Sequence, residues 1–96
     1  MMHECHVFFE TLGYKLKLNI ISKLKEKPMI VTELSEELNQ ERSKVSHALI
    51  SLLDCKFIHV KKDGRKRIYS LNSETILPLL NIANIHIKKF CKKCKN

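Results

Sequence analysis

Apolar residues recur at intervals of three and four between residues 7 and 27, which is the period of a helix with one buried face. Gly13 interrupts this pattern, so the sequence predicts a short first helix followed by a longer second one. Pro28 removes a backbone donor and is expected to end the second helix. The apolar positions of the pattern are Phe8, Phe9, Leu12, Leu16, Ile20, Ile21 and Leu24.

Two further helices are predicted along the chain, separated by a tight break at Asn39. Thr32 offers an N-cap for a short third helix, with Glu33 at a position where the helix dipole favours an acidic side chain. Asn39 suits the break because asparagine tolerates the left-handed conformation. The fourth helix is predicted from residue 42 to about residue 56.

The fourth helix has two distinct faces. The apolar face is expected to lie in the core and consists of Val45, Leu49, Leu52 and Leu53. The opposite face holds Ser43, His47, Ile50 and Asp54, flanked by Arg42 and Ser46. A solvated helix face is usually richer in Glu and Lys, so short hydrogen-bonding side chains beside an arginine indicate a binding face.

Beyond the fourth helix the apolar period changes to two residues, which predicts a β-hairpin. Two segments of β-forming residues, 57–62 and 66–71, flank the turn sequence Asp63-Gly64-Arg65. Asp-Gly between such segments is a strong hairpin signal, because the turn requires a positive φ. The tip carries five cations against one aspartate, namely Lys61, Lys62, Arg65, Lys66 and Arg67.

A last helix is predicted after Ser73, which offers an N-cap, with Glu74 in the first turn. One apolar stripe of this helix is formed by Ile76, Leu79, Leu80, Ala83, Ile87 and Phe90. Its other sides are apolar as well, through Leu77, Ile82 and Ile85. One small domain cannot cover a helix that is apolar nearly all round, so we expect a second copy of the chain to cover it.

The length and composition fit one domain spanning residues 1–96. Hydrophobic residues make up 44% of the chain, enough for a core, and two glycines and two prolines are too few for a β-sandwich or barrel. No apolar run approaches the roughly 18 residues of a membrane span, and the first residues lack a signal-peptide pattern. We therefore expect a cytoplasmic protein that is mainly α-helical and carries one β-hairpin.

The net charge of +8 comes from the second half of the chain. Residues 1–50 hold seven Lys and Arg against seven Asp and Glu, whereas residues 51–96 hold eleven against three. Such an asymmetry is typical of proteins that bind nucleic acid or anionic lipid, although it also occurs where charge only keeps a protein soluble. The order of the predicted elements must decide between these interpretations.

That order is typical of a winged helix-turn-helix, with five helices and a two-stranded wing. The major groove of DNA admits one α-helix, so the fourth helix would meet base edges while the wing holds the backbone or the minor groove. We therefore predict a transcriptional regulator that binds double-stranded DNA. Its predicted DNA contacts are Arg42, Ser43, Lys44, Ser46, His47, Lys61, Lys62, Arg65, Lys66 and Arg67.

Three parts of the chain resemble the ArsR/SmtB family of repressors: LGYKLKLNII at 12–21, ELSEEL with SKVSHAL at 33–38 and 43–49, and DGR with RIYSL at 63–65 and 67–71. The resemblance runs from about residue 8 to residue 90. It implies a homodimeric repressor that binds palindromic operators. The dimer would form through the first and last helices, with contacts from Phe8, Phe9, Leu12, Leu79, Leu80, Ala83 and Phe90.

The resemblance also implies two positions where relatives bind metal, and both lack ligands here. Ile30 and Thr32 stand where one family site has a cysteine pair, and neither side chain binds zinc. At the second family site only His86 keeps a ligand side chain, and we interpret it as structural. The other three positions of that site are Ser73, Thr75 and Lys89.

The four cysteines leave a less conventional metal or redox hypothesis open. Cys91 and Cys94 lie one helical turn apart, which would let them share zinc or another thiophilic metal. The family fold packs the first helix beside the last, which implies further ligands from His3, Cys5 and His6. Cys55 matches a cysteine that some relatives use for soft metals, or it fills a small apolar gap. The tail thiols could also form a disulfide between dimer ends or bind nothing.

Two other classes of function compete with DNA binding. A winged helix that only binds other proteins would leave the basic wing without an obvious partner. An enzyme is not expected, because the sequence has no Ser/His/Asp order, no phosphate-binding glycine loop and no paired catalytic carboxylates.

Overall fold

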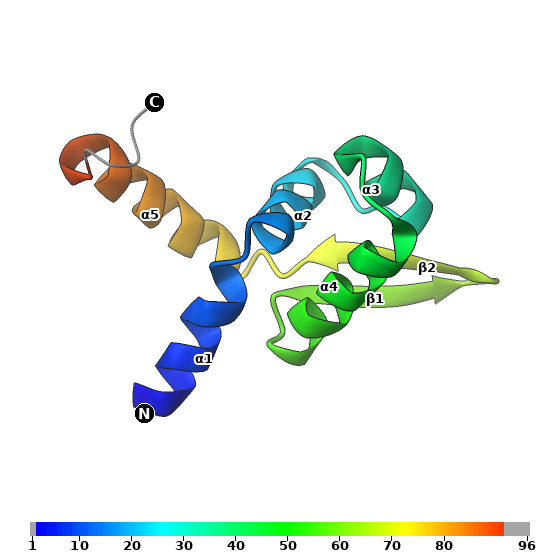
Figure 1. The fold of residues 1–96 in the computed structure, drawn as a ribbon, viewed down its shortest axis with the longest axis horizontal. Coiled ribbons are helices and arrows are strands. Elements are labelled where there is room, and N and C mark those ends of the chain that lie inside the picture. Colours follow the sequence, from blue (N-terminus) through cyan, green and yellow to red (C-terminus); the bar gives the residue numbers. More distant parts are fainter. Residues whose placement is uncertain (1, 92–96) are drawn as a thin grey trace.

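Residues 2–91, which the computed structural model describes with side chains from residue 6 onward, form five helices and one antiparallel hairpin (Figure 1). The elements are α1 (Met2–Leu12), α2 (Lys15–Glu26), α3 (Val31–Leu38), α4 (Arg42–Asp54), β1 (Ile58–Asp63), β2 (Lys66–Leu71) and α5 (Ile76–Phe90). None of these helices is long and apolar enough to cross a membrane. The order and the mostly helical content confirm the predicted winged helix-turn-helix.

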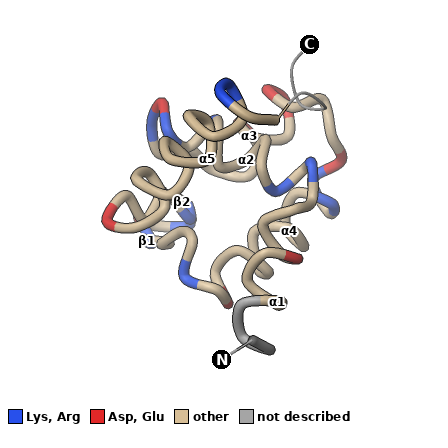
Figure 2. The backbone as a smooth tube through the Cα atoms, turned by 90° about the vertical axis from the view of Figure 1, so that its left-hand side faces the viewer, with Lys and Arg blue, Asp and Glu red and all other residues tan. Residues whose placement is uncertain are grey.

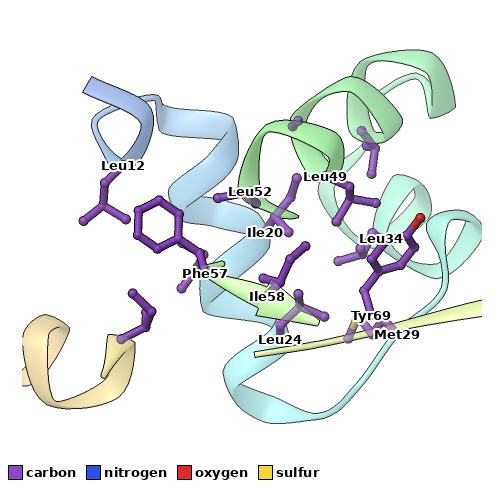
Figure 3. Close-up of a cluster of buried hydrophobic side chains, with 14 residues drawn as sticks. Leu12, Ile20, Leu24, Met29, Leu34, Leu49, Leu52, Phe57, Ile58 and Tyr69 are labelled. Atoms are coloured by element: carbon purple, nitrogen blue, oxygen red, sulfur yellow. The ribbon is translucent and has the colours of Figure 1, made fainter. Parts of the chain in front are cut away.

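Helices α2, α3 and α4 pack around the base of the hairpin and enclose a hydrophobic core (Figure 3). The predicted stripe of α4 lies in this core, although Leu53 is only half-buried. Phe57 and Ile58 close the core from the hairpin side, each with 1% of its surface exposed. No polar side chain of the described residues is buried, so apolar packing holds these elements together.

Two residues with positive φ end the helices of the helix-turn-helix. Asn39 has φ 52° and ψ 50°, and its backbone N–H donates to carbonyl groups in the last turn of α3. This confirms the predicted break. Lys56 has a φ of 62°, and the next N–H, that of Phe57, donates to the Leu52 carbonyl at 3.0 Å. The sequence did not indicate Lys56, because lysine has no preference for this conformation.

Helix α3 begins two residues earlier than Thr32 would allow as an N-cap. Its first residue is Val31, so Thr32 lies inside the helix and the predicted cap is wrong. The residue before the helix is Ile30, whose side chain has no acceptor. The Glu33 carboxylate reaches back instead and accepts a hydrogen bond of 3.1 Å from the backbone N–H of Ile30. Glu33, in the first turn, therefore stabilises the helix start without an N-cap side chain.

Helix α5 begins later than predicted. Its first residue is Ile76, so Ser73 is not its N-cap and Glu74 lies before its first turn. Asn72 explains the delay, because its side-chain amide donates to the Lys56 carbonyl at 2.8 Å and ties this segment to the end of α4. Residues 73–75 then form a turn before the helix starts.

Beyond its first turns, α5 projects away from the rest of the chain (Figure 1, Figure 2). Ile76 is buried, and Leu79 and Leu80 are half-buried against the core. Most of the later apolar side chains of the helix are exposed. Both views show α1 pointing in a different direction from α5, so these helices do not lie side by side within one chain.

We expect Phe57→Ala to lower the free energy of unfolding by roughly 3–5 kcal/mol. The centre of its ring lies 4.9 Å from that of Phe8, so truncation would leave a cavity between α1 and the hairpin. Urea unfolding followed by circular dichroism measures the change. Val60→Ala in the neighbouring strand β1 is the control, because Val60 is 43% exposed and should matter far less. Equal losses in the two variants would contradict this packing.

Candidate nucleic-acid interface

Helix α4 presents the polar face that the sequence predicted. Every predicted contact on this helix reaches the surface, since Arg42, Ser43, Lys44 and His47 are exposed and Ser46 is half-buried. The short side chains of Ser43 and Ser46 let the first two turns approach a partner closely. A helix with its side chains is about 10–12 Å across, and the major groove of B-DNA is about 12 Å wide. The face therefore fits a major groove.

The connection between α3 and α4 fixes the direction of this face. The Ser35 hydroxyl donates to the Gln40 carbonyl at 2.5 Å, and the Gln40 backbone N–H donates to the Ser35 carbonyl at 3.0 Å. Leu34 and Val45, one from each helix, are fully buried below the connection. Two reciprocal hydrogen bonds above a packed pair hold α4 at one angle to α3.

The hairpin has a turn and a register that bring its cations to the tip. Asp63 pairs with Lys66, which leaves a loop of two residues, Gly64 and Arg65. Gly64 has a φ of +64°, and glycine is the residue that adopts this conformation without strain at the first loop position. All five predicted cations are exposed: Lys61, Lys62, Arg65, Lys66 and Arg67.

Two of the wing cations face each other directly. Lys62 pairs with Arg67 in the strand register, on the same face of the sheet as Val60 and Tyr69. Like charges in directly opposite positions destabilise a strand pair. The ion pairs within residues 6–91 use carboxylates on α1, α2 and α3, and none of them reaches a wing cation. A pair of facing, unneutralised cations suits a phosphate group.

Acidic side chains gather along α2 and α3 instead. Lys23 lies 3.2 Å from Glu37 and 3.9 Å from Glu26, and Lys27 lies 3.9 Å from Glu33. These pairs neutralise the lysines at the end of α2. The positive charge of the wing and of the α4 face is left for a partner outside the chain.

The sequence did not indicate that Tyr14 and Lys17 lie beside the predicted binding face of α4. Tyr14 and Lys17, at the start of α2, line a groove together with Lys44 and His47 of α4. The Lys17 ammonium lies 4.8 Å from the centre of the Tyr14 ring. Helical periodicity places Lys17 off the core stripe, but only the packing of α2 against α4 brings it to the predicted binding face.

The predicted dimer contacts differ in their exposure within the chain. Leu12 is buried in the core, and Phe8, Leu79 and Leu80 are half-buried against it. Phe9, Ala83 and Phe90 are exposed. Together with Ile82 and Ile85, the exposed residues of α5 form an apolar surface that the described part of the chain does not cover. We refer to Ile82, Ala83, Ile85 and Phe90 as the α5 surface.

The predicted metal ligands are not brought together within one chain. Cys94 and the side chains of His3 and Cys5 lie outside the described residues. His6 lies 3.4 Å from Glu10 on α1, whereas Cys91 follows the last residue of α5, and these helices diverge (Figure 1). The described residues contain no group of three or more His, Cys, Asp or Glu side chains that could hold a metal ion. The expected packing of the first helix beside the last is therefore wrong within a chain.

Cys55 lies between two helices, whereas His86 is exposed on α5. Cys55 follows α4 and is half-buried against the core, and its thiol donates to the Thr11 hydroxyl at 3.7 Å. This geometry supports the interpretation that Cys55 fills a gap between α4 and α1. The His86 ring lies 5.3 Å from the Phe90 ring on α5.

We expect Lys62→Gln to raise the free energy of unfolding by about 0.2–1 kcal/mol, because it removes the repulsion from Arg67 across the strand pair. The gain should shrink as salt is added. Thermal and urea unfolding at low and high salt measure both effects. Lys61→Gln is the matched control, because it removes the same charge opposite the uncharged Ile68. Equal gains from the two variants would contradict a specific repulsion.

Comparison with known proteins finds similar sequences. Residues 15–60 match the model of the family "Bacterial regulatory protein, arsR family". Over 77 residues the chain is 32% identical to the HTH-type transcriptional regulator NmtR of Mycobacterium tuberculosis, covering 80% of this chain and 64% of NmtR. The chain thus spans just under two thirds of the length of that relative.

Solved structures agree with this likeness. Rv0081 of M. tuberculosis has a TM-score of 0.80 at 29% identity, covering 85% of this chain and 83% of that one. The homodimeric winged helix-turn-helix DNA-binding domain Mb0332 of Mycobacterium bovis has a TM-score of 0.84 at 13% identity, covering 99% and 88%, which shows the shared fold. The order of elements, the wing and the match at residues 15–60 together show a winged helix-turn-helix fold that is similar to the bacterial ArsR family.

Proposed function

We propose that this protein is a homodimeric transcriptional regulator that binds double-stranded DNA, with α4 in the major groove and the wing on the adjacent backbone or minor groove. The observation that carries the proposal is the pairing of an exposed polar α4 face with a wing whose cations have no carboxylate partner in the described residues. The relatives support it: NmtR is an HTH-type transcriptional regulator, and Mb0332 is a homodimeric DNA-binding domain.

The proposal assigns base contacts and phosphate contacts to different residues. Arg42, Ser43, Ser46 and His47 meet base edges, where Arg pairs with guanine and the shorter side chains bond either base type. The wing cations hold phosphates and release counterions, so they supply affinity without reading sequence. The wing residues in this role are Lys61, Lys62, Arg65, Lys66 and Arg67.

The α5 surface supplies the dimer contact in this proposal. Ile82 is 65% exposed, Ile85 is 55% exposed and Phe90 is 70% exposed within one chain, which is unfavourable for a soluble domain. A second copy would cover the same surface by two-fold symmetry. Two copies of α4 would then reach half-sites about one turn of DNA apart, which predicts a palindromic operator.

The competing functions have less support. A protein-interaction module would not use the facing cations Lys62 and Arg67, and the relative NmtR is a transcriptional regulator rather than an enzyme. Repression rather than activation remains what the family resemblance implies. A response to zinc, to another thiophilic metal or to thiol oxidation stays a prediction that depends on Cys91 and Cys94.

We expect base-reading and phosphate-holding variants to behave differently on an operator isolated by selection from genomic fragments. His47→Ala should relax preference at one operator position, at a cost of roughly 1–3 kcal/mol. Lys66→Gln should weaken binding to every duplex alike and lower the salt slope by about one unit. Fluorescence anisotropy with operator and unrelated duplexes measures both. If the two variants give the same pattern, the division of roles is wrong; if the wild-type protein binds no duplex, the proposed function is wrong.

We expect Ala83→Asp to convert the dimer to a monomer, because an unpaired carboxylate would be buried in the seam. Ala83 is exposed within one chain, so this change leaves the core of each copy intact. Asn84→Asp adds the same charge to an exposed polar position on the opposite side of α5 and serves as the control. Sedimentation velocity at micromolar concentration reads the result. A monomeric wild-type protein, or a dimeric Ala83→Asp variant, would contradict the predicted seam.

A further inference from the structure

We propose that the groove between α2 and α4 is a second contact site for the DNA backbone, centred on Lys17 and independent of the wing. The inference rests on the proposed function, because it assigns a further part of the same DNA interface. It adds Lys17 and Tyr14 to the binding residues and predicts phosphate contacts on the side of α4 that the groove borders.

The groove has walls from two helices and a basic rim. Its volume is about 320 Å³, and its lining includes Leu16 and Ala48 on the floor side, with Lys17, Lys44 and His47 as its basic groups. No carboxylate is among its lining residues. An apolar floor with basic groups at the rim matches a deoxyribose and its phosphate, which present an apolar ring beside an anion.

Lys17 differs from the other half-buried lysine of the same helix. Lys23 lies within 4 Å of the carboxylates of Glu26 and Glu37, so its charge is neutralised inside the chain. Lys17 is also half-buried, but no ion pair within residues 6–91 includes it. A partly desolvated ammonium gains more from an anion than a fully solvated one does. Lys17 is therefore prepared for an anion from outside the chain.

The Tyr14 ring holds this ammonium in place. The Lys17 nitrogen lies 4.8 Å from the ring centre, within the range of a cation–π contact. Tyr14 precedes α2, and the first intrahelical bond runs from the Leu18 N–H to the Tyr14 carbonyl at 3.0 Å. The first turn of α2 contains no acidic residue and no side-chain cap, so the positive end of the helix dipole adds to the charge of Lys17.

The position of the groove on α4 matches the edge of a major groove. At about 100° per residue, Lys44 lies roughly a quarter turn from the centre of the exposed face at Ser43 and His47. When a helix lies in the major groove, its two edges face the two backbones that border the groove. Lys44 and Lys17 would therefore meet one of these backbones.

The test compares Lys17→Gln with Lys25→Gln, which removes the same charge from an exposed position near the other end of α2. Lys17→Gln should weaken binding to operator and unrelated duplexes alike, by about fivefold near 0.15 M salt, and lower the salt slope by about one unit. Lys25→Gln should bind as the wild type does. Tyr14→Leu keeps the charge, so it should weaken binding less and leave the salt slope unchanged.

Two further measurements make the outcome decisive. Thermal unfolding of each variant should stay close to that of the wild type, because Lys17 has no carboxylate partner within residues 6–91 and its contact with the exposed Tyr14 ring is weak. Phosphate ethylation interference should lose different phosphates with Lys17→Gln than with Lys66→Gln. Wild-type affinity and slope in Lys17→Gln would overturn this inference while leaving the proposed function intact, and so would an equal loss in Lys25→Gln. Failure of the wild-type protein to bind any duplex would overturn both.

Discussion

A reciprocal pair of backbone hydrogen bonds between Met29 and Tyr69 determines how the wing is held against the rest of the chain. The Met29 N–H donates to the Tyr69 carbonyl at 3.0 Å, and the Tyr69 N–H donates to the Met29 carbonyl at 2.9 Å. Met29 is 2% exposed and Tyr69 is 7% exposed, so these bonds are shielded from water. Because side chains alternate between the two faces of a strand, fixing Tyr69 toward the core also fixes Arg67 on the same face, beyond the core edge. A slip of one residue would exchange Arg67 and Tyr69 with their neighbours, burying Ile68 and Ser70 instead.

This constraint explains why the wing tolerates an arrangement that is unfavourable by itself. Lys62 and Arg67 repel each other across the strand pair, yet the register that opposes them is set by buried residues at the base of the hairpin. The chain neutralises Lys23 and Lys27 with carboxylates and leaves the wing without such partners in the described residues. Cations concentrated in this way lower the stability of the free protein, and the binding of a polyanion would remove their mutual repulsion.

Local chemistry was enough to predict the order of elements, the break at Asn39 and the two faces of α4. The helix starts were less predictable, since Ile30 has no side-chain acceptor and the start of α3 is held instead by the bond from the Ile30 N–H to Glu33. In the same way, the anchoring of Asn72 to Lys56 delays α5. Contacts between elements could not be predicted, because periodicity does not show that α1 and α5 diverge (Figure 1) or that Lys17 lies beside His47. Exposure of α5 was foreseeable because its apolar residues exceed what one small domain can cover.

The size of the proposed DNA interface gives a reason for the second copy in the proposed dimer. A single DNA-binding module of this kind buries about 600–1,000 Å² of protein surface, and much of its affinity comes from phosphate contacts that do not read sequence. In one copy only the first two turns of α4, from Arg42 to His47, are placed to read bases, which covers a few base pairs. Discrimination against the many competing sites of a genome requires a longer readout. In the proposed dimer, two copies joined through the α5 surface would double the number of bases read while each keeps its own wing, so the apolar surface that is unfavourable in the monomer would make specific recognition possible.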